Sequence, residues 1–412
     1  MNVTIKPAAL SGTIDAIPSK SYAHRYLICA ALAANQNASV IDIGAASRDI
    51  AATADCLTSL GASIDIKDGV YNVSPIKNKI SMPDLFCCES GSTLRFLTPV
   101  AAALGGGRFK MEGRLGSRPM DELIKCLIDH GAKLEKNENI LTVSGAMTGG
   151  EFKIAGNVSS QYISGILFAL PLCGGGRVTL TTQLESRPYV TMTIEAMAAF
   201  GVNVTDDEKG FTVASDQCYH SAKAKVPGDW SNAAFWLASG VGVKGLSPNC
   251  AQGDRAIIEV LERMGAPVRY ENGIYKADVS HLHGCEVDAQ DIPDAVPIIS
   301  VLAGRAEGVT KIYNAARLRA KESDRIETTS AMLTALGVKN DQTDDGLVIN
   351  GDSRKFRSCK VDCANDHRIA MSASVAAEYA EDDVTLVGAE AVNKSYPTFF
   401  EDYKKLGGVI NV

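Results

Sequence analysis

The stretch RIETTSAMLTALG, from Arg325 to Gly337, shows the pattern on which this chain is built: a cation opens a helix-like run and a glycine closes it. The same pattern runs from Arg48 to Gly61, Arg118 to Gly131, Arg187 to Gly201, Arg255 to Gly265 and Lys394 to Gly407. Successive cations are separated by 118 − 48 = 70, 187 − 118 = 69, 255 − 187 = 68, 325 − 255 = 70 and 394 − 325 = 69 residues. This regularity predicts six copies of one unit of about 70 residues.

The repeated cation lies where helix electrostatics disfavours it. The first turn of a helix has unpaired N–H groups and a partial positive charge, so Arg or Lys is normally unfavourable there. A cation placed at this point in every unit therefore suggests that an anion is held at these helix starts.

A second set of markers follows the same period. Each unit has a helical run of small residues that ends in a turn and leads into an alternating strand, as in ALPLCGGGRVTL from Ala169. A short hairpin follows the closing glycine, as in GAKLEKNENILTV from Gly131. The order in each unit is therefore predicted to be strand, helix, strand, helix, strand, strand, which is an α/β (or α+β) fold class.

Six such units exceed one ordinary core, so we expect two domains of three units each. The sixth unit stops after GGVINV without its last strand, and Val3 to Lys6 is predicted to supply it. Residues 1–17 and 227–412 would then form the first domain, with 18–226 inserted as the second. Proline and glycine punctuate both crossings. We expect the active site in the cleft between the two domains.

Composition limits the classes of partner. The net charge is −7, whereas general affinity for nucleic acid or anionic membrane needs a broad basic face. The longest apolar runs, such as YISGILFALPL from Tyr162, are too short to span a membrane, and the start MNVTIKPAALSG has no basic-then-apolar signal pattern. We therefore expect a cytoplasmic protein, a monomer, that binds neither nucleic acid nor membrane.

Cysteine usage predicts no metal site and no disulfide framework. The 11 cysteines are odd in number and lie mostly within apolar stretches, which is typical of reduced core residues. The two groups that resemble metal ligands are Cys359, Cys363 and His367, and His281, His283 and Cys285. Neither group has a second convincing pair, so we predict that no metal is bound.

The first helix of each unit begins in matching phase with small, polar or charged residues. The six starts are PSKSYAHR from Pro18, ESGSTLR from Glu89, VSSQYIS from Val158, GDWSNAAF from Gly228, IPDAVPI from Ile292 and NDHRIAMS from Asn365. Such segments can cap a helix or bind a ligand. If three of these helices surround a pseudo-threefold axis in each domain, their N-termini point the same way and two facing domains enclose an electropositive cleft.

The cations expected in this cleft are Lys20, Arg25, Arg95, Arg118, Lys321, Arg325, Arg368 and Lys394. We interpret them as lacking carboxylate partners nearby in the sequence, which implies ligands with several anionic groups, such as phosphate and carboxylate. Simpler alternatives stay open. Ser90, Ser159, Ser160 and Asp366 can be helix caps, Arg48, Arg187 and Arg255 can be solvated or structural, and Arg95 can be a buried structural cation.

Nine fragments, in order and in phase, closely resemble the enolpyruvyl transferase family. They are PSKSYAHR, SGSTLRFLTP, GSRPMDEL, VSSQYISG, SRPYVTMT, IPDAVP, ARLRAKESDR, NDHRIAM and NKSYPTFF, and they cover nearly the whole chain. The resemblance implies two domains, each an inside-out barrel of three βαβαββ repeats around a pseudo-threefold axis. It also implies addition of the enolpyruvyl group of phosphoenolpyruvate to the 5-hydroxyl of shikimate 3-phosphate and then loss of phosphate, in aromatic amino acid biosynthesis. No cofactor is needed, since arginine can neutralise the leaving phosphate.

The resemblance also implies the residues of the site. Shikimate 3-phosphate would be held by Lys20, Ser21, Arg25, Ser159, Ser160, Gln161, Ser186, Asp294 and Lys321. Phosphoenolpyruvate would be held by Lys20, Gly91, Arg118, Gln161, Arg325, Arg368 and Lys394. Because addition and elimination each move a proton, acid and base groups are needed on both sides of a cationic carbon. Asp294 and Lys321 are candidates near the hydroxyl, Glu322 is the candidate acid toward the methylene group, and Lys20 and His367 can assist. The structural alternative for Asp294 is a helix N-cap.

Two other functions are weighed against this one. The same fold can act on UDP-N-acetylglucosamine in cell-wall synthesis, but that relative carries a cysteine on the loop before its G-x-R-P segment, where this chain has Glu112, Gly113, Arg114 and Leu115. A non-catalytic phosphometabolite-binding protein would not need Asp294, Lys321 and Glu322 together. A P-loop kinase is disfavoured because no G-x-x-x-x-G-K-[ST] segment is present.

Overall fold

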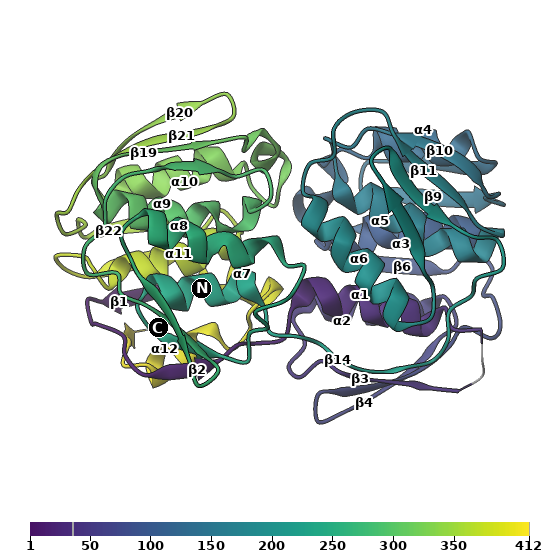
Figure 1. Ribbon diagram of the computed structural model, residues 1–412, viewed down its shortest axis with the longest axis horizontal. Helices are drawn as coiled ribbons and strands as arrows, with labels where there is room; N and C mark the ends of the chain where they lie inside the picture. The colour runs from purple at the N-terminus through teal and green to yellow at the C-terminus, as the bar shows by residue number, and fades with distance from the viewer. Residues whose placement is uncertain (35–36, 412) are drawn as a thin grey trace. The chain divides into compact units, whose positions relative to one another are not determined.

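The computed structural model describes residues 1–34 and 37–411, and the chain divides into two compact units (Figure 1). Residues Pro18–Val226 form one of them, here called the inserted unit. Residues Met1–Ile17 and Pro227–Val412 together form the other, here called the terminal unit. No helix within the described ranges combines the length and apolarity that crossing a membrane requires.

Every sheet of the inserted unit has four strands and the same topology. Two parallel strands are followed by an antiparallel hairpin whose second strand takes the inner place. In spatial order the sheets are β14 (Lys223–Lys225), β3 (Ser39–Asp42), β5 (Val70–Ser74) and β4 (Ser63–Lys67); β6 (Asp84–Cys88), β7 (Gly107–Met111), β9 (Ile140–Gly145) and β8 (Ala132–Asn137); and β10 (Gly150–Ile154), β11 (Gly176–Leu180), β13 (Gly210–Val213) and β12 (Val204–Asp207).

The terminal unit repeats this topology in three further sheets. In spatial order they are β2 (Thr13–Asp15), β15 (Gly242–Lys244), β17 (Ile274–Ala277) and β16 (Val268–Glu271); β18 (Glu286–Asp288), β19 (Glu307–Tyr313), β21 (Gly346–Asp352) and β20 (Lys339–Thr343); and β22 (Cys359–Asp362), β23 (Val384–Val387), β1 (Asn2–Lys6) and β24 (Val409–Asn411). Strand β1 pairs antiparallel with both β23 and β24. The prediction that the N-terminal strand completes the sixth repeat is therefore confirmed.

The first strands of the first and fourth repeats are exchanged along the chain. Strand β2 precedes the first helix of the inserted unit, yet it pairs with β15 of the terminal unit. Strand β14 precedes the first helix of the fourth repeat, yet it pairs with β3. Pro18 and Pro227 follow these strands, and because proline cannot donate to a sheet ladder, the chain leaves each sheet at that point.

Each repeat contributes two helices. The first helices are α1 (Lys20–Ala31), α3 (Gly91–Leu104), α5 (Ser160–Ala169), α7 (Trp230–Ala238), α9 (Val296–Arg305) and α11 (His367–Ala377). The second helices are α2 (Arg48–Ser59), α4 (Asp121–Ile128), α6 (Arg187–Ala199), α8 (Ile257–Arg263), α10 (Arg325–Ala335) and α12 (Phe399–Lys405). Short 3₁₀ turns are η1 (Gly113–Ser117), η2 (Leu170–Cys173), η3 (Gly253–Ala256), η4 (Pro293–Ala295), η5 (Ala316–Ala320) and η6 (Ala389–Lys394).

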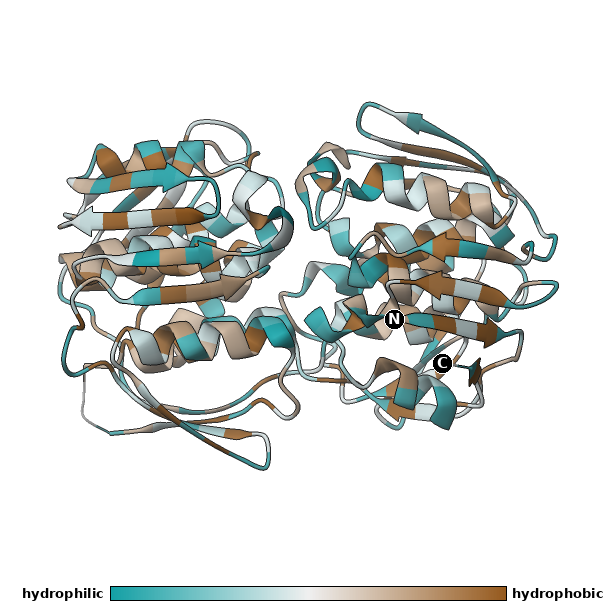
Figure 2. Cartoon of the chain, turned by 180° about the vertical axis from the view of Figure 1, so that it is seen from behind, coloured by the Kyte–Doolittle hydropathy of each residue, from teal (hydrophilic) through white to brown (hydrophobic). Residues whose placement is uncertain are grey.

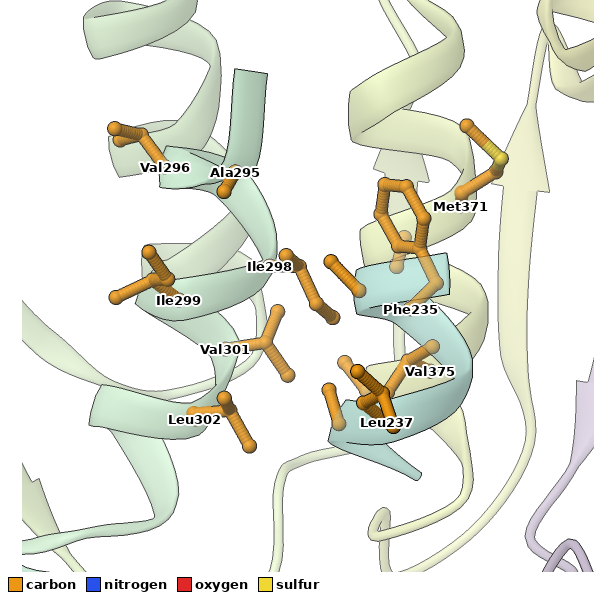
Figure 3. Close-up of a cluster of buried hydrophobic side chains, with 14 of the residues drawn as sticks. Phe235, Leu237, Ala295, Val296, Ile298, Ile299, Val301, Leu302, Met371 and Val375 are labelled. Carbon is orange, nitrogen blue, oxygen red and sulfur yellow. The ribbon is translucent and has the colours of Figure 1, made fainter. Parts of the chain in front are cut away.

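The first helices form the core of each unit, and the sheets lie outside them. Every residue of α7 and of α11 is buried, which is typical of a helix surrounded by others. Figure 3 shows part of the core of the terminal unit, where Phe235 of α7, Ile298 of α9 and Val375 of α11 belong to one buried cluster. The strands instead alternate buried and exposed residues, seen in Figure 2 as bands of brown and teal. This is the predicted inside-out arrangement.

The repeated glycines and cations have distinct positions. All six closing glycines have positive φ: Gly61 (111°), Gly131 (92°), Gly201 (86°), Gly265 (85°), Gly337 (85°) and Gly407 (104°). They end the helices in the left-handed conformation that glycine adopts without strain. The cations open a helix only at Arg48, Arg187 and Arg325. Arg118, Arg255 and Lys394 end or lie in 3₁₀ turns before the helix, so the prediction was wrong at these three.

A buried carboxyl at the far end of the core makes stability depend on pH. Glu378, at the C-terminus of α11, accepts a hydrogen bond of 2.6 Å from Ser239, at the C-terminus of α7. Burial raises the pKa of Glu378 from 4.5 to about 8, although the Ser239 hydrogen bond opposes the shift. The folded state therefore holds a proton that the unfolded chain has lost between these pH values, so the free energy of unfolding falls as pH rises through this window, by up to about 1.4 kcal/mol per pH unit.

We expect Glu378→Gln to remove this pH dependence, because the amide keeps the shape of the side chain and has no proton to lose. Urea denaturation at pH 5 and pH 8 measures the effect. Wild type should lose more stability than Glu378→Gln between the two pH values. Equal losses would show that Glu378 is ionised at neutral pH in the folded chain.

Candidate active site

The terminal unit gathers carboxylates around one buried arginine. Arg325, the first residue of α10, is 1% exposed. Its Nε donates to Asp366 Oδ2 at 2.8 Å, its Nη1 to Asp294 Oδ1 at 2.7 Å, and its Nη2 to Glu322 Oε2 at 2.7 Å. These partners raise the pKa of Arg325 although burial opposes the change, so the guanidinium stays charged. The interpretation that the site cations lack close carboxylate partners was therefore wrong for Arg325.

Asp294 joins three cations. Besides Arg325, it lies 3.6 Å from Lys321 Nζ and accepts a hydrogen bond of 3.3 Å from Arg368 Nη2. Burial favours its protonated form, but the charges of Lys321, Arg368 and Arg325 prevail and hold the pKa of Asp294 well below its usual range. Asp294 lies in turn η4 and does not cap helix α9, so the N-cap alternative is wrong.

The start of α11 holds the next group of predicted residues. Asp366 is the N-cap, and its carboxylate accepts from the backbone N–H of Arg368 at 2.9 Å as well as from Arg325. The cap alternative for Asp366 is correct but incomplete. Ala364 and Asn365 just before it both have positive φ, and Lys394 donates to the Asn365 carbonyl at 2.6 Å. Lys394 thus stabilises a strained turn at the helix start.

Arg368 has donor capacity that the described residues leave unused. Its guanidinium is buried, and the central carbon of that group, Cζ, lies 5.9 Å from the centre of the Phe235 ring. No described residue accepts a hydrogen bond from its Nε or Nη1. His367 beside it is also buried, with Nδ1 4.0 Å from Asp366 Oδ1. A buried cation with unsatisfied N–H groups is the arrangement expected where an anionic ligand binds.

In the inserted unit, two arginines converge on the start of α3. A Cβ placed on Gly91 would lie 2.7 Å from Nη1 of Arg118 and 2.8 Å from Nη1 of Arg95. Gly91 is the first residue of α3, after the N-cap Ser90, whose hydroxyl accepts from the Thr93 N–H. The glycine therefore allows two guanidinium groups to approach a helix N-terminus, which concentrates positive charge there.

Gln161 is fixed next to this pair. Arg95 donates to Gln161 Oε1 at 2.9 Å and to the Pro119 carbonyl at 3.2 Å, while Gln161 Nε2 donates to Ser92 at 3.0 Å. Ser159 caps α5 through the Gln161 N–H, and Ser160 is the first residue of that helix. Arg95 is thus a buried cation that positions Gln161, as its structural alternative predicted.

A second group of predicted site residues, Arg25 and Ser186, lies where α1 packs against α6. Arg25 is buried and donates to the Ser21 carbonyl at 2.7 Å, the Tyr189 carbonyl at 2.8 Å and the Thr193 hydroxyl at 2.9 Å. Burial lowers the pKa of Arg25 to about 10, so it stays protonated at neutral pH. Ser186, the N-cap of α6, is buried with φ 54°. Strained φ at a buried polar residue is often found at binding sites.

Lys20 also has a carboxylate partner that sequence spacing did not reveal. Its ammonium lies 2.8 Å from Asp49 Oδ2, and both side chains are largely buried. Asp49 is in the first turn of α2, where an acidic residue favours the helix dipole.

The cations that recur once in each repeat differ in their exposure to solvent. Arg48 pairs with Glu112 and Arg187 with Asp206, each at 2.7 Å and with both side chains at least one-third exposed to solvent. Arg118, Arg325 and Lys394 are buried. Sequence phase could not distinguish the two sets, because all six cations share one position in the repeat. The sequence analysis also missed Asp49, the partner of Lys20, and Tyr189, whose carbonyl accepts from Arg25, although Tyr189 lies in the same SRPY segment as Ser186. Among residues 1–34 and 37–411, no group of three His, Cys, Asp or Glu side chains is arranged to hold a metal ion.

Comparisons with known proteins agree over the full length of the chain. The family model described as EPSP synthase (3-phosphoshikimate 1-carboxyvinyltransferase) matches residues 5–403. The 3-phosphoshikimate 1-carboxyvinyltransferase of Clostridium beijerinckii is 38% identical over 100% of this chain and 98% of that protein, and that of Clostridium acetobutylicum is 39% identical over 99% and 98%. The structure of EPSP synthase from Acinetobacter baumannii superimposes with a TM-score of 0.81 at 26% identity, covering 100% of both chains. The enolpyruvyl transferase NikO from Streptomyces tendae has a TM-score of 0.78 at 17% identity, a likeness of fold alone.

Proposed function

The chain belongs to the EPSP synthase family, and from this we propose that its buried cations bind the two anionic substrates of that family's reaction. The chain is a 3-phosphoshikimate 1-carboxyvinyltransferase, a transferase of the shikimate pathway. It moves the enolpyruvyl group of phosphoenolpyruvate to the 5-hydroxyl of shikimate 3-phosphate and releases phosphate. The observation that carries the site assignment is the buried Arg325, which links Asp294, Glu322 and Asp366.

Shikimate 3-phosphate takes the residues of α1, α5 and α6, together with two from the terminal unit. Lys20, Ser21, Arg25, Ser159, Ser160, Gln161, Ser186, Asp294 and Lys321 are the proposed contacts. Three helix starts with serine hydroxyls and two cations suit a dianionic phosphate, because helix N–H groups and cations both favour negative charge.

Phosphoenolpyruvate takes the residues around Gly91 and those at the starts of α10 and α11. Lys20, Gly91, Arg118, Gln161, Arg325, Arg368 and Lys394 are the proposed contacts. Arg368 supports this assignment most directly, since the described residues leave its Nε and Nη1 without hydrogen-bond acceptors. Each of these two N–H positions can donate a charge-assisted hydrogen bond to a carboxylate or phosphate oxygen.

Asp294 is the proposed base for the 5-hydroxyl. Its depressed pKa keeps it ionised at neutral pH, so it accepts a proton and does not supply one. Lys321, 3.6 Å from Asp294, stabilises the negative charge that develops on the hydroxyl oxygen as the proton leaves. The ion pair between Lys321 and Asp294 also keeps the Asp294 carboxylate ionised until the hydroxyl gives up its proton.

Glu322 is the proposed acid toward the methylene carbon. Substrate binding is what allows Glu322 to take up the proton that it then donates. Glu322 accepts a hydrogen bond of 2.7 Å from Arg325, and this ion pair favours the carboxylate form. When the substrate carboxylate takes Arg325, that ion pair weakens and Glu322 gains affinity for a proton. Lys20 and His367 assist these transfers.

Phosphate release tests the proposed function. We expect the purified protein to release inorganic phosphate only when both substrates are present, because breaking the carbon–oxygen bond requires prior addition of the hydroxyl. Phosphate released from phosphoenolpyruvate alone would indicate simple hydrolysis. No release under any condition, together with tight binding of shikimate 3-phosphate, would favour a non-catalytic phosphometabolite-binding protein.

A thermal-shift comparison separates the cell-wall alternative. Shikimate 3-phosphate should raise the melting temperature, whereas UDP-N-acetylglucosamine at the same concentration should not. The reverse result would assign the chain to the UDP-sugar reaction.

Gly91→Ala should weaken phosphoenolpyruvate binding without preventing folding. The added methyl group would lie 2.7 Å from Arg118 Nη1 and 2.8 Å from Arg95 Nη1, so both guanidinium groups must move. We expect KM for phosphoenolpyruvate to rise about tenfold or more, by analogy with displaced charge contacts, while KM for shikimate 3-phosphate changes little. Gly105→Ala, at the end of the same helix, controls for lost stability alone: its φ of 111° strains an alanine, but nothing lies within 4 Å of the added carbon, so no guanidinium group is displaced. An equal rise of both KM values would contradict the assignment.

A further inference from the structure

One first helix of the terminal unit has no assigned role although its start matches the others. Counting from the N-cap, the second helical residue is Ser21 in α1, Gln161 in α5 and Arg368 in α11, and all three are proposed substrate contacts. The corresponding residue of α7, which follows the N-cap Asp229, is Ser231. It belongs to none of the sets described above.

Ser231 is joined to a buried carboxylate. Its hydroxyl donates a short hydrogen bond to Oδ2 of Asp254, which lies in η3 and is 2% exposed. The neighbouring Gln252 holds η3 against the start of α7: its Oε1 accepts from the Trp230 N–H at 3.0 Å, and its Nε2 donates to the Gly228 carbonyl at 2.8 Å. The Ser231–Asp254 pair is therefore fixed at the head of the core helices.

Turn η3, which carries Asp254, packs against η4 and α7, and α7 packs against α11, so charged groups of these elements lie around the pair. Asp294 of η4 and Asp229 before α7 are acidic, and Arg368 of α11 is basic. Arg368 has one acidic partner within hydrogen-bonding distance, Asp294 at 3.3 Å, and it keeps two N–H groups without acceptors among the described residues. Asp254 is thus a second carboxylate that acts on Arg368 through space.

We propose that Asp254, held by Ser231, is a positioning residue that balances the charge of Arg368 and releases it to the anionic substrate by taking up a proton. The inference rests on the proposed function, because it assigns phosphoenolpyruvate to Arg368. An anion that binds Arg368 repels an ionised Asp254, and protonation of Asp254 removes this repulsion. The proton comes from solvent, and no bond other than the O–H bond forms.

The titration of Asp254 falls in a measurable range. Burial, with the charges of Asp294 and Asp229, raises its pKa to about 6, whereas Arg368 and the Ser231 hydrogen bond lower it. Asp254 is therefore largely ionised at pH 8 and largely protonated at pH 5.5. Substrate binding favours the protonated form, so KM for phosphoenolpyruvate is expected to rise as pH increases through this interval.

The test is the pH profile of KM for phosphoenolpyruvate between pH 5.5 and 8. Titration of the substrate itself affects every variant equally, so the comparison is with wild type at each pH. Asp254→Asn, which still accepts the Ser231 hydrogen bond, should match wild type at pH 5.5 and have a KM about fivefold lower at pH 8. Ser231→Ala should move the wild-type rise to higher pH, because it removes a hydrogen bond that favours the ionised form.

Glu378→Gln is the matched control. It removes another buried carboxyl with a serine partner, at the opposite ends of α7 and α11, and should leave the KM profile unchanged. Active enzyme whose Asp254→Asn profile parallels wild type at every pH would overturn the inference and leave the proposed function standing. Absence of turnover in wild type would overturn both. Should Asp254→Asn fail to fold, an unmoved profile in Ser231→Ala would by itself reject the proposal.

Discussion

Asp294→Asn is expected to lower kcat about 10³-fold while phosphoenolpyruvate binding stays the same or tightens. The amide has the shape of the carboxylate but cannot accept the proton of the 5-hydroxyl, and general base catalysis typically contributes about 10² to 10⁴ in rate. Asp294 also neutralises Lys321, Arg325 and Arg368. Removing its charge leaves these cations more positive, which favours an anionic substrate.

Steady-state kinetics with each substrate varied measures this split between kcat and KM. Asp324→Asn is a suitable control, because Asp324 caps α10 one residue before Arg325 and bonds Arg319. Asn caps a helix about as well as Asp, so this variant should keep the cap and leave kcat nearly unchanged. A kcat for Asp294→Asn within tenfold of wild type would remove Asp294 from the catalytic set, and a large rise in KM alone would assign it to binding.

The repeat could be predicted from sequence because its signals are local. A glycine that ends a helix adopts positive φ because of hydrogen bonds to the last turn, only a few residues away, and all six closing glycines do so. Strand β1 was predicted because the sixth repeat lacked one strand, which is a matter of counting. The sheet partners of β2 and β14 depend on where the chain crosses between the two units, next to Pro18 and Pro227.

The candidate site was predictable only in part. Asp294, Arg325 and Arg368 were predicted from their positions in the repeat, and the structure brings these three together in the terminal unit. It did not show that Asp366 bonds Arg325, because that contact joins residues 41 apart on different helices. Cap residues are read from sequence as local features, whereas Asp366 is both a cap and an ion-pair partner. Packing of α10 against α11 decides the second role.

Arg325→Gln is expected to destabilise the terminal unit by about 3 to 5 kcal/mol, a much larger effect than loss of an exposed ion pair. The change leaves Asp366, which is fully buried, and also Glu322 and Asp294 without their shared cation. Breaking a buried ion pair from one side is costly because the remaining charges stay desolvated. Urea denaturation followed by tryptophan fluorescence reports on this unit alone, since both tryptophans, Trp230 and Trp236, lie buried in it.

Two further variants show whether charge is the cause. Arg354→Gln removes a guanidinium from a solvent-exposed pair with Asp352 in the same unit and should leave the urea midpoint unchanged. Arg325→Gln combined with Glu322→Gln should recover part of the lost stability, because one of the stranded carboxylates is then neutral. If the double variant is as unstable as the sum of the single ones, the loss comes from packing around the guanidinium, and the carboxylates around Arg325 do not depend on its charge.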